Sequence, residues 1–264
     1  MQQHHDLAIT AALESGKKIL EIYDTGDFDV TEKSDHSPLT RADRAAHEVI
    51  TKALENSGFP VLSEEGRDIP HEERRLWNTF WLVDPLDGTK EFIKRNGEFT
   101  VNIALIKQGA PAFGVVYAPV LEDLYIGIPG EGAWILTKPA PKSTLEEIIQ
   151  KGTPLPDAHK TNNTAYRVVA SRSHLNAETE AYIEKLTSSH GTVETVSKGS
   201  SLKLCMVASG EAHEYPRLGP TMEWDVAAAH AVVLGAGKKV TIFGTGQPLQ
   251  YNKADLLNPY FLVQ

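Results

Sequence analysis

Cysteine is almost absent from this sequence of 264 residues, which contains only Cys205. One cysteine forms no intrachain disulfide, and the apolar neighbours in "SLKLCMVASG" predict a core position. No apolar run approaches the roughly 20 residues that cross a bilayer, and "MQQHHDLAIT" lacks the basic and apolar regions of a signal peptide. We therefore expect a cytoplasmic protein without integral membrane association. Peripheral association with the cytoplasmic face of the inner membrane stays open.

Blocks of Lys or Arg are also missing. The chain carries 26 basic and 35 acidic side chains, giving a net charge of −9, and no basic run is typical of nucleic-acid binding. We expect no nucleic-acid polymer as a partner. A small anionic substrate is compatible with this charge, because metal ions and a few local bases reverse the field inside a site.

The first half of the chain predicts two helices followed by a sheet. Apolar residues recur at three- and four-residue steps over 9–23, and again after Thr40 as far as Gly58, which indicates two core-facing helices. Six β-rich runs follow over 59–137, separated by Gly, Pro or charged turns. Several runs are adjacent enough to form an antiparallel meander.

The second half alternates between strands and helices. The stretch 138–165 is rich in Pro, Lys, Thr and Asn, with one expected helix at "STLEEIIQ". From "YRVVAS" to "KKVTIF", β-rich runs and helical runs then take turns, which is typical of an α/β protein. We place a boundary between residues 1–160, an α+β region, and residues 161–264, an α/β region.

The run "WLVDPLDGTKEF", from Trp81 to Phe92, ends in two acids three residues apart. A turn is one interpretation, with Asp87 or Thr89 capping a following helix. A metal site is the other, because carboxylates at i and i+3 lie about 5–6 Å apart on one side of a turn or helical start. That separation suits a pair of divalent cations roughly 3.5–4 Å apart. The run alone leaves both open.

Further acids stand where strands end or helices begin. Glu64 and Glu65 end the run "FPVLS", and Asp225 opens an Ala-rich helix. They are either solvated surface acids and a helix-dipole partner, worth roughly 0.3–1 kcal/mol, or metal ligands. Carboxylates that converge in one crevice repel one another unless cations lie among them. Oxygen ligands without Cys or clustered His select Mg²⁺, Mn²⁺ or Ca²⁺ over zinc.

Several motifs together resemble a known superfamily. "VLSEE", "WLVDPLDGT" and "EWDVAAAH", in this order, are similar to the lithium-sensitive, magnesium-dependent phosphomonoesterases that include inositol monophosphatase. "GVVYAPV", "SRSH", "GSSLK" and "YPRLGPT" make the chain more similar to one branch, the bacterial 3′(2′),5′-bisphosphate nucleotidases of the CysQ type. The resemblance spans nearly the whole chain and is weakest over 137–164, where extra polar residues occur.

The resemblance implies a fold and a division of labour. The fold is a layered αβαβα sandwich of the inositol monophosphatase and fructose-1,6-bisphosphatase type. Residues 1–160 would bind metal and residues 161–264 would bind substrate. The resemblance also implies two or three Mg²⁺ ions, the first held by Glu64, Asp84 and the Leu86 carbonyl, the second by Asp84, Asp87 and Asp225. Glu65 would be an outer ligand or belong to a weaker third site.

The resemblance also implies catalytic roles. The backbone N–H groups of Gly88 and Thr89 would meet the phosphate, and the Thr89 hydroxyl, hydrogen-bonded to Asp43, would orient and deprotonate the attacking water. Glu64 would act with them through the metal. The sequence "TRAD" before the second helix has a second interpretation as a capping box.

Substrate recognition is expected from the second half. "KGSSLK" predicts an anion site at a helix N-terminus. The resemblance puts the following residues around the nucleotide, with Asp225 beside it: His174, Ser201, Lys203 and Arg217. Arg217 would hold a second phosphate as a fork. A lone His after a strand is also typical of a surface or structural position, so that alternative stays open for His174.

The function implied by the resemblance is hydrolysis of the 3′-phosphate of adenosine 3′,5′-bisphosphate to AMP and phosphate, by a water activated between two metals. It allows 3′-phosphoadenylyl sulfate as a second substrate, which would link the protein to sulfur metabolism, and predicts inhibition by Li⁺. An inositol monophosphatase is the alternative, although it has no evident use for Lys203 and Arg217. A non-enzymatic nucleotide or metal sensor is another, and the intact pair of Asp43 and Thr89 disfavours it. Monomer and homodimer both stay open.

Overall fold

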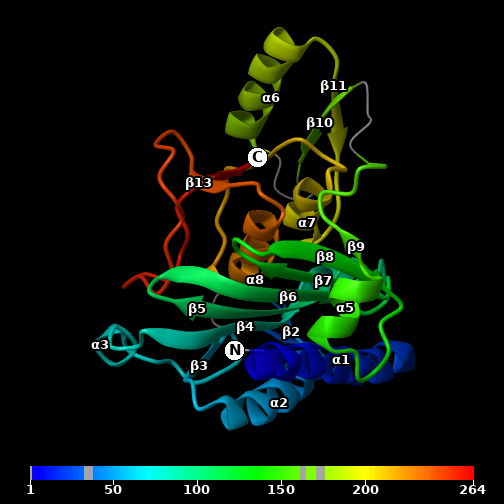
Figure 1. The fold of residues 1–264 in the computed structure, drawn as a ribbon, viewed down its shortest axis with the longest axis vertical. Coiled ribbons are helices and arrows are strands. Elements are labelled where there is room, and N and C mark those ends of the chain that lie inside the picture. Colours follow the sequence, from blue (N-terminus) through cyan, green and yellow to red (C-terminus); the bar gives the residue numbers. More distant parts are fainter. Residues whose placement is uncertain (1, 33–37, 161–164, 171–175) are drawn as a thin grey trace.

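The computed structural model describes the chain except for residues 1, 33–37, 161–164 and 171–175. Its first layer consists of two helices, α1 (Gln2–Thr25) and α2 (Arg41–Leu54), which pack on one face of a large sheet. The short strands β1 (Thr31–Glu32) and β2 (Pro38–Leu39) pair between them, and the 3-10 turn η1 (Glu55–Ser57) follows α2. Both helices predicted from the apolar spacing are confirmed (Figure 1).

The second layer is a seven-stranded sheet in the order β3–β4–β5–β6–β7–β8–β9. Strand β3 is parallel to β4, and every other neighbouring pair is antiparallel, which confirms the predicted meander. The bounds are β3 Val61–Ser63, β4 Thr79–Asp87, β5 Thr100–Lys107, β6 Ala110–Ala118, β7 Asp123–Ile128, β8 Gly132–Thr137 and β9 Thr153–Pro154. Three short helices lie in the connections around this sheet, α3 (His71–Arg74), α4 (Thr89–Ile93) and α5 (Leu145–Lys151).

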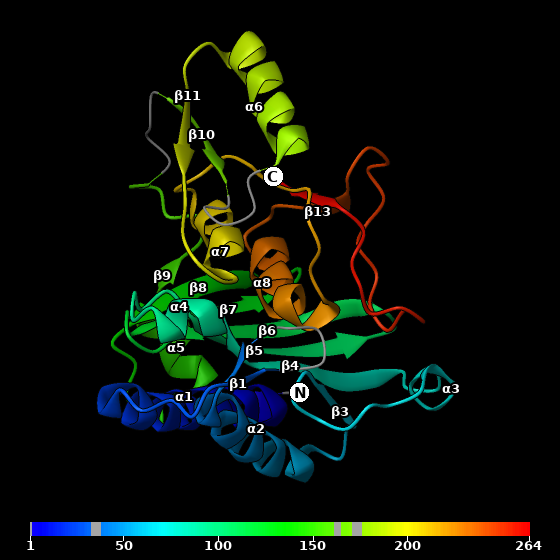
Figure 2. The ribbon, with the colours of Figure 1, turned by 180° about the vertical axis from the view of Figure 1, so that it is seen from behind.

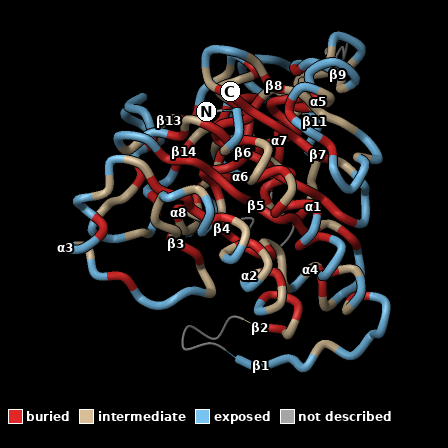
Figure 3. The backbone as a smooth tube through the Cα atoms, turned by 60° about the horizontal axis from the view of Figure 1, so that its bottom comes forward, coloured by how far each residue is buried: buried red, intermediate tan, exposed pale blue. Residues whose placement is uncertain are grey.

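Both faces of this sheet are buried, as the red central strands of Figure 3 show. Along β4, Phe80 and Leu82 belong to one apolar cluster, and Trp81 and Val83 belong to the other. Successive strand residues point to opposite faces, so one apolar run supplies two cores at once. This explains why the run "TFWLV" is continuous rather than alternating.

The third layer comes from the second half of the chain. Helices α7 (Leu202–Ser209) and α8 (Glu223–Gly235) cover the face of the sheet opposite α1 and α2 (Figure 2). A Cβ on Gly114 of β6 would collide with the Ala228 carbonyl, and one on Gly127 of β7 would collide with Val232. The Ala-rich helix α8 therefore lies against the sheet at a distance that only small residues allow.

The remaining layers lie beyond α7 and α8. Strands β10 (Tyr166–Val169) and β11 (Val193–Val196) are parallel, and a small antiparallel sheet has the order β12–β14–β13. Helix α6 (Ala177–His190) is outermost. The bounds of the small sheet are β12 Tyr215–Arg217, β13 Val240–Ile242 and β14 Phe261–Val263. The predicted αβαβα sandwich is confirmed, although the sequence pattern did not predict β14.

The two halves of the chain share one core. The apolar cluster between the sheet and α8 contains both Leu82 and Val232, which lie on opposite sides of residue 160. The boundary at residue 160 stays a prediction. Among the helices that the structure describes, none combines the length and hydropathy needed to span a membrane.

Candidate active site

The paired aspartates lie in a bulged strand rather than in a turn. Strand β4 continues through Pro85 to Asp87, and its pairing with β5 shifts register between Asp84, opposite Asn102, and Asp87, opposite Thr100. A proline has no N–H to give to the ladder, and a bulge is where a strand accommodates one. The interpretation of this run as a turn with an Asp87 or Thr89 cap is therefore excluded, since α4 has Gly88 at its N-cap and no side-chain cap.

Gly88 makes the change from strand to helix. Its φ of 93° lies in the left-handed region, which favours glycine. The chain therefore passes from Asp87 directly into α4, and Thr89 is placed beside the strand end.

Glu64 and Glu65 occupy a tight turn at the end of β3. The Gly66 N–H donates to the Ser63 carbonyl at 3.0 Å, and the Glu64 N–H donates to the Val83 carbonyl at 3.1 Å. The second bond ties this turn to β4 beside Asp84. The expected convergence of acids from two strand ends therefore has a structural basis.

Four carboxyl groups influence one another in this region. Asp84 is 1% exposed, and burial, followed by the charges of Glu64, Asp87 and Asp225, raises its pKa well above the ordinary value. Burial and the charges of Asp87 and Glu64 likewise raise the pKa of Asp225. Ionised carboxyls in such a place need a compensating cation.

The donor chemistry fits a hard divalent cation, because the set consists of carboxyl oxygens and carbonyls. In the portion of the chain that the structure describes, no three His, Cys, Asp or Glu side chains form a ready-made metal cluster. Two of the carboxyls are hydrogen-bonded within the protein. Asp225 Oδ2 accepts from the Met222 N–H at 2.8 Å, and Asp87 Oδ2 accepts from Ser200 and Ser201.

Asp43 serves both interpretations of "TRAD". Its Oδ2 accepts from the Thr40 N–H at 2.7 Å and from the Thr40 hydroxyl at 2.6 Å, which completes a capping box at the start of α2. Its Oδ1 accepts from the Thr89 hydroxyl at 3.2 Å. The cap fixes Asp43 in the buried position where it meets Thr89.

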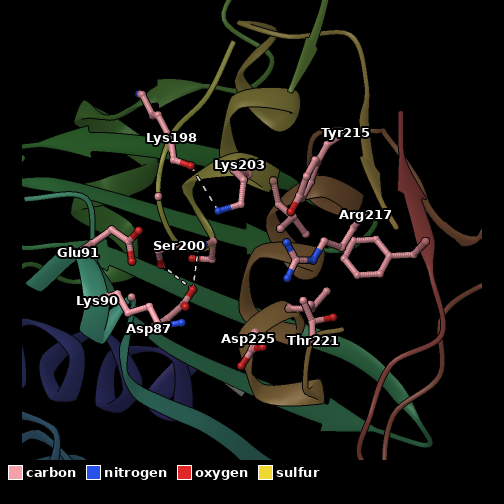
Figure 4. Close-up of a pocket in the computed structure, with 16 residues that line it drawn as sticks. Asp87, Lys90, Glu91, Lys198, Ser200, Lys203, Tyr215, Arg217, Thr221 and Asp225 are labelled. Atoms are coloured by element: carbon pink, nitrogen blue, oxygen red, sulfur yellow. Dashed lines mark hydrogen bonds between the residues drawn. The ribbon is translucent and has the colours of Figure 1, made fainter. Parts of the chain in front are cut away.

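Predicted site residues from both halves of the chain line a common pocket (Figure 4): Asp87, Gly88, Ser201, Lys203, Arg217 and Asp225. Lys203 Nζ donates to the Lys198 carbonyl at 3.3 Å. The pKa of Lys203 is lowered to about 8, mainly by burial; the Arg217 charge contributes to this lowering, and the Asp87 charge opposes it. The pocket thus holds two cations close to the carboxyl groups.

Arg217 is only partly satisfied by the protein. Its Nη2 donates to the Pro220 carbonyl at 2.7 Å, whereas its buried Nε finds no partner among the described residues. A buried donor without a partner is costly, and Figure 4 shows the guanidinium directed into the pocket. An anionic ligand would satisfy it.

Ser201 presents its backbone rather than its hydroxyl to the carboxyl groups. Its N–H donates to Asp87 Oδ2 at 2.7 Å, while its buried hydroxyl donates to Asn102 Oδ1 at 2.9 Å. The remaining predicted residue, His174, lies outside the described residues.

Sequence reasoning placed Ser200 in the anion site expected at "KGSSLK" but missed Thr100 and Asn102, and all three contact Asp87 or its neighbours. A signal for Thr100 and Asn102 was present. Polar residues at i and i+2 on the run "FTVNIALI" share one face of a strand whose other residues are apolar. Tyr215 was also missed, and it lines the pocket beside Arg217.

The fold and this group of residues define a class of protein. The chain belongs to the inositol monophosphatase family, whose model matches residues 1–261. It is 47% identical over 263 residues to the 3′(2′),5′-bisphosphate nucleotidase CysQ of Shigella flexneri, and the match covers 98% of each chain.

Solved structures agree. The crystal structure of CysQ from Bacteroides thetaiotaomicron, described as a bacterial member of the inositol monophosphatase family, has a TM-score of 0.90 at 50% identity. That match covers 100% of this chain and 97% of the other. An IMPase of Thermotoga maritima has a TM-score of 0.74 at 20% identity, covering 98% and 91%, and shows the likeness of fold alone. The resemblance read from the sequence motifs is confirmed.

Proposed function

We propose that this chain is a metal-dependent 3′(2′),5′-bisphosphate nucleotidase that converts adenosine 3′,5′-bisphosphate to AMP and phosphate. The observation that carries the proposal is the pair of cations, Lys203 and Arg217, in one pocket with Asp87 and Asp225. One phosphate would react at the carboxyl groups while the other is held by the cations. The nucleotidase named for the Shigella flexneri relative supports this substrate class.

The metal in this proposal is Mg²⁺, as two or three ions. The residues that would hold it are Glu64, Asp84, the Leu86 carbonyl, Asp87 and Asp225, with Glu65 as an outer ligand. When bound, divalent cations neutralise the charge of the phosphate and lower the pKa of a water molecule.

Thr89 and Asp43 would handle the proton of the attacking water. The Thr89 hydroxyl donates to Asp43 Oδ1, so its lone pairs are free to accept a proton from water as its own proton moves to Asp43. Because Asp43 is 2% exposed, bulk water does not compete for this bond. The N–H groups of Gly88 and Thr89, at the turn into α4, would orient the phosphate.

Lys203 and Arg217 would hold the 5′-phosphate. A guanidinium and an ammonium in one pocket give charge-assisted hydrogen bonds to phosphate oxygens. The same contacts would serve 3′-phosphoadenylyl sulfate, which carries a 5′-phosphosulfate. We propose it as a second substrate, which would place the enzyme in sulfur metabolism. A cytoplasmic location and a monomeric or homodimeric state stay predictions.

The first experiment measures phosphate release with Mg²⁺ from adenosine 3′,5′-bisphosphate and from inositol 1-phosphate, each with and without millimolar Li⁺. We expect faster phosphate release from the nucleotide than from the inositol ester, and we expect Li⁺ to abolish this activity. Preference for the inositol ester would keep the metal ligands and overturn the role of Lys203 and Arg217. Activity on neither substrate would favour a nucleotide or metal sensor.

Asp87→Asn separates the enzyme from that sensor. Charge stabilisation by a metal site is worth several kcal/mol, so we expect the turnover number to fall more than about 100-fold with the circular dichroism spectrum unchanged. Phosphate release at the wild-type rate would contradict the role of Asp87 as a metal ligand.

A further inference from the structure

Three buried polar side chains meet where apolar residues would be expected. Thr100 is 0% exposed, Asn102 is 1% exposed and Ser201 is 2% exposed. Thr100 and Asn102 share one face of β5, in the large sheet, whereas Ser201 precedes α7 in the second half of the chain. Buried polar groups of this kind are costly unless each is satisfied.

Hydrogen bonds join these residues to the loop before α7. The Thr100 hydroxyl lies 2.6 Å from the Ser200 hydroxyl, 2.9 Å from the Ser201 hydroxyl and 3.0 Å from Asn102 Oδ1. The Gly199 N–H donates to Glu98 Oε2 at 3.0 Å. The loop 198–201 is therefore attached to the start of β5 along its length.

The bonds that end at the Asp87 carboxylate have a fixed direction. An ionised carboxylate only accepts, so Ser200 donates to Asp87 Oδ2 at 2.5 Å. The Thr100 hydroxyl also has one proton, and three acceptors lie within 3.0 Å of it: the Ser200 hydroxyl, the Ser201 hydroxyl and Asn102 Oδ1. Ser201 donates to Asn102 Oδ1, and Asn102 Nδ2 in turn lies 3.4 Å from Asp87 Oδ2. Both branches end at the same carboxylate oxygen.

One oxygen of Asp87 thus accepts the hydrogen bonds in which both branches end. Oδ2 accepts from the Ser200 hydroxyl, the Ser201 N–H and Asn102, which leaves Oδ1 for a cation. Ser200 has a φ of 55°, in the region that non-glycine residues rarely adopt. The bonds from its hydroxyl to Thr100 and Asp87 hold it there.

We propose that Thr100, Asn102 and Ser200 are positioning residues, which fix the Asp87 carboxylate and the loop that leads to Lys203 as one unit. The proposal rests on the proposed function, because it assigns Asp87 to the metal and Lys203 to the nucleotide. The network couples the two, so that loosening it weakens metal binding and nucleotide binding together.

Thr100→Val tests this, because it removes the hydroxyl and nearly preserves the shape. Groups that orient a metal ligand typically contribute 10–100-fold in metal affinity. We expect Mg²⁺ binding measured by calorimetry to weaken about 10-fold, KM for adenosine 3′,5′-bisphosphate to rise, and amide exchange to increase over 198–204. Thr100→Ser, which restores a hydroxyl, should recover all three.

Thr179→Val is the matched control. Thr179, on α6, is also buried and also donates its hydroxyl to an asparagine Oδ1, that of Asn176 at 2.6 Å. It should leave Mg²⁺ affinity and KM unchanged. If Thr179→Val weakened Mg²⁺ binding as much as Thr100→Val, the effect would be general destabilisation and the proposal would be overturned.

Ser200→Gly keeps the test decisive if Thr100→Val does not fold, because glycine suits a φ of 55°. It removes the bond to Asp87 and should weaken Mg²⁺ binding similarly, and the double variant should be no weaker than the single ones because the residues act in series. Folded variants with wild-type Mg²⁺ affinity and KM would overturn the proposal. Calorimetry measures Mg²⁺ binding without turnover. A wild-type protein that binds Mg²⁺ but does not hydrolyse the nucleotide would therefore refute the proposed function and leave the positioning proposal testable.

Discussion

At the scale of single residues, side chains that stabilise the fold also belong to the proposed site. Asp43 completes the cap of α2 and accepts the Thr89 hydroxyl, and Asp225 accepts the Met222 N–H at the start of α8 beside the other carboxyls. The capping contact of each acid is therefore compatible with its proposed role in the site. In each acid one carboxyl oxygen makes the capping contact, and in Asp43 the other accepts from Thr89.

Asp43→Asn separates the two roles. With the amide NH₂ in the place of Oδ1, the side chain would donate a hydrogen bond where the Thr89 hydroxyl needs an acceptor. We therefore expect the turnover number to fall about 100–10,000-fold, as for loss of a general base. Thr40→Ala should instead lower the free energy of unfolding by about 1 kcal/mol through the lost cap, with a much smaller change in turnover. Steady-state kinetics and urea denaturation measure the two effects. An Asp43→Asn protein with wild-type turnover would rule out the proton route through Thr89.

Lys203 predicts a pH dependence of substrate binding. With its pKa lowered to about 8, mainly by burial, the ammonium is mostly charged below pH 8 and mostly neutral above it. We expect kcat/KM for adenosine 3′,5′-bisphosphate to fall as the pH rises through about 8, since this ratio reports the free enzyme.

Lys203→Arg and Lys203→Met are the controls for that profile. Arginine stays charged throughout, so its profile should lack the fall near pH 8. Methionine should give a low kcat/KM at every pH, by about 10–100-fold, the loss typical of a hydrogen bond to a charged group. A fall near pH 8 that persists in Lys203→Arg would assign the titration to another group.

At the scale of elements, close packing sets the position of the site. Helix α8 carries Asp225 at its N-terminus, and it reaches the sheet because β6 and β7 present glycines to its alanines. The short distance brings Asp225 towards Asp84 and Asp87, which lie on β4 in the same sheet.

Gly114→Ala should therefore destabilise the protein. The added methyl would meet the Ala228 carbonyl, and overpacking of this kind typically costs about 1–3 kcal/mol. Urea denaturation measures it, and Ala110→Val, at an exposed position of the same strand, should change the free energy of unfolding by less than about 0.5 kcal/mol. Equal stabilities would mean that α8 moves away from the sheet at little cost.

At the scale of the whole molecule, the site depends on layers from both halves of the chain. Asp84 and Asp87 come from the large sheet, Asp225 and Lys203 come from the helices above it, and Arg217 comes from the small sheet beyond. Binding of a cation among the carboxyls should therefore stabilise the entire fold rather than one half.

The stabilisation by Mg²⁺ should depend on pH. A carboxyl whose pKa is raised by folding binds more protons in the folded state than in the unfolded state. The metal-free protein therefore loses stability as the pH rises from the ordinary carboxyl pKa towards the raised pKa. Asp84 and Asp225 are such groups. Below that range protons neutralise them and compete with Mg²⁺.

We expect saturating Mg²⁺ to raise the melting temperature more at pH 8 than at pH 5.5. At 100 times the dissociation constant the gain is about 2.7 kcal/mol, and a thermal melt with and without EDTA measures it. Asp87→Asn should reduce the gain at pH 8. An equal shift at both pH values would contradict the link between the raised pKa values and the metal site.

The amino-acid sequence alone was enough to predict most elements, their class and the family. Helical spacing, the apolar run of β4 and the acids at strand ends are local patterns. Such patterns can be recognised in the sequence without knowledge of the tertiary structure. They sufficed to predict α1, α2 and the meander, and the order of the motifs indicated the family. The final strand β14 was missed, although β3, β12 and β13 are equally short and were predicted.

The meeting of distant residues depends instead on the packing of the folded chain. Nothing local in "KGSSLK" shows that the Ser201 hydroxyl turns towards Asn102 or that Ser200 meets Asp87, since those partners lie about a hundred positions away in sequence. The pKa of Lys203 likewise depends on burial in the folded protein and on charges such as that of Asp87, which lies far from it in sequence. Hydrogen bonds and desolvation act over a few ångströms in space, and the packing of α7 and α8 on the sheet is what sets those distances here.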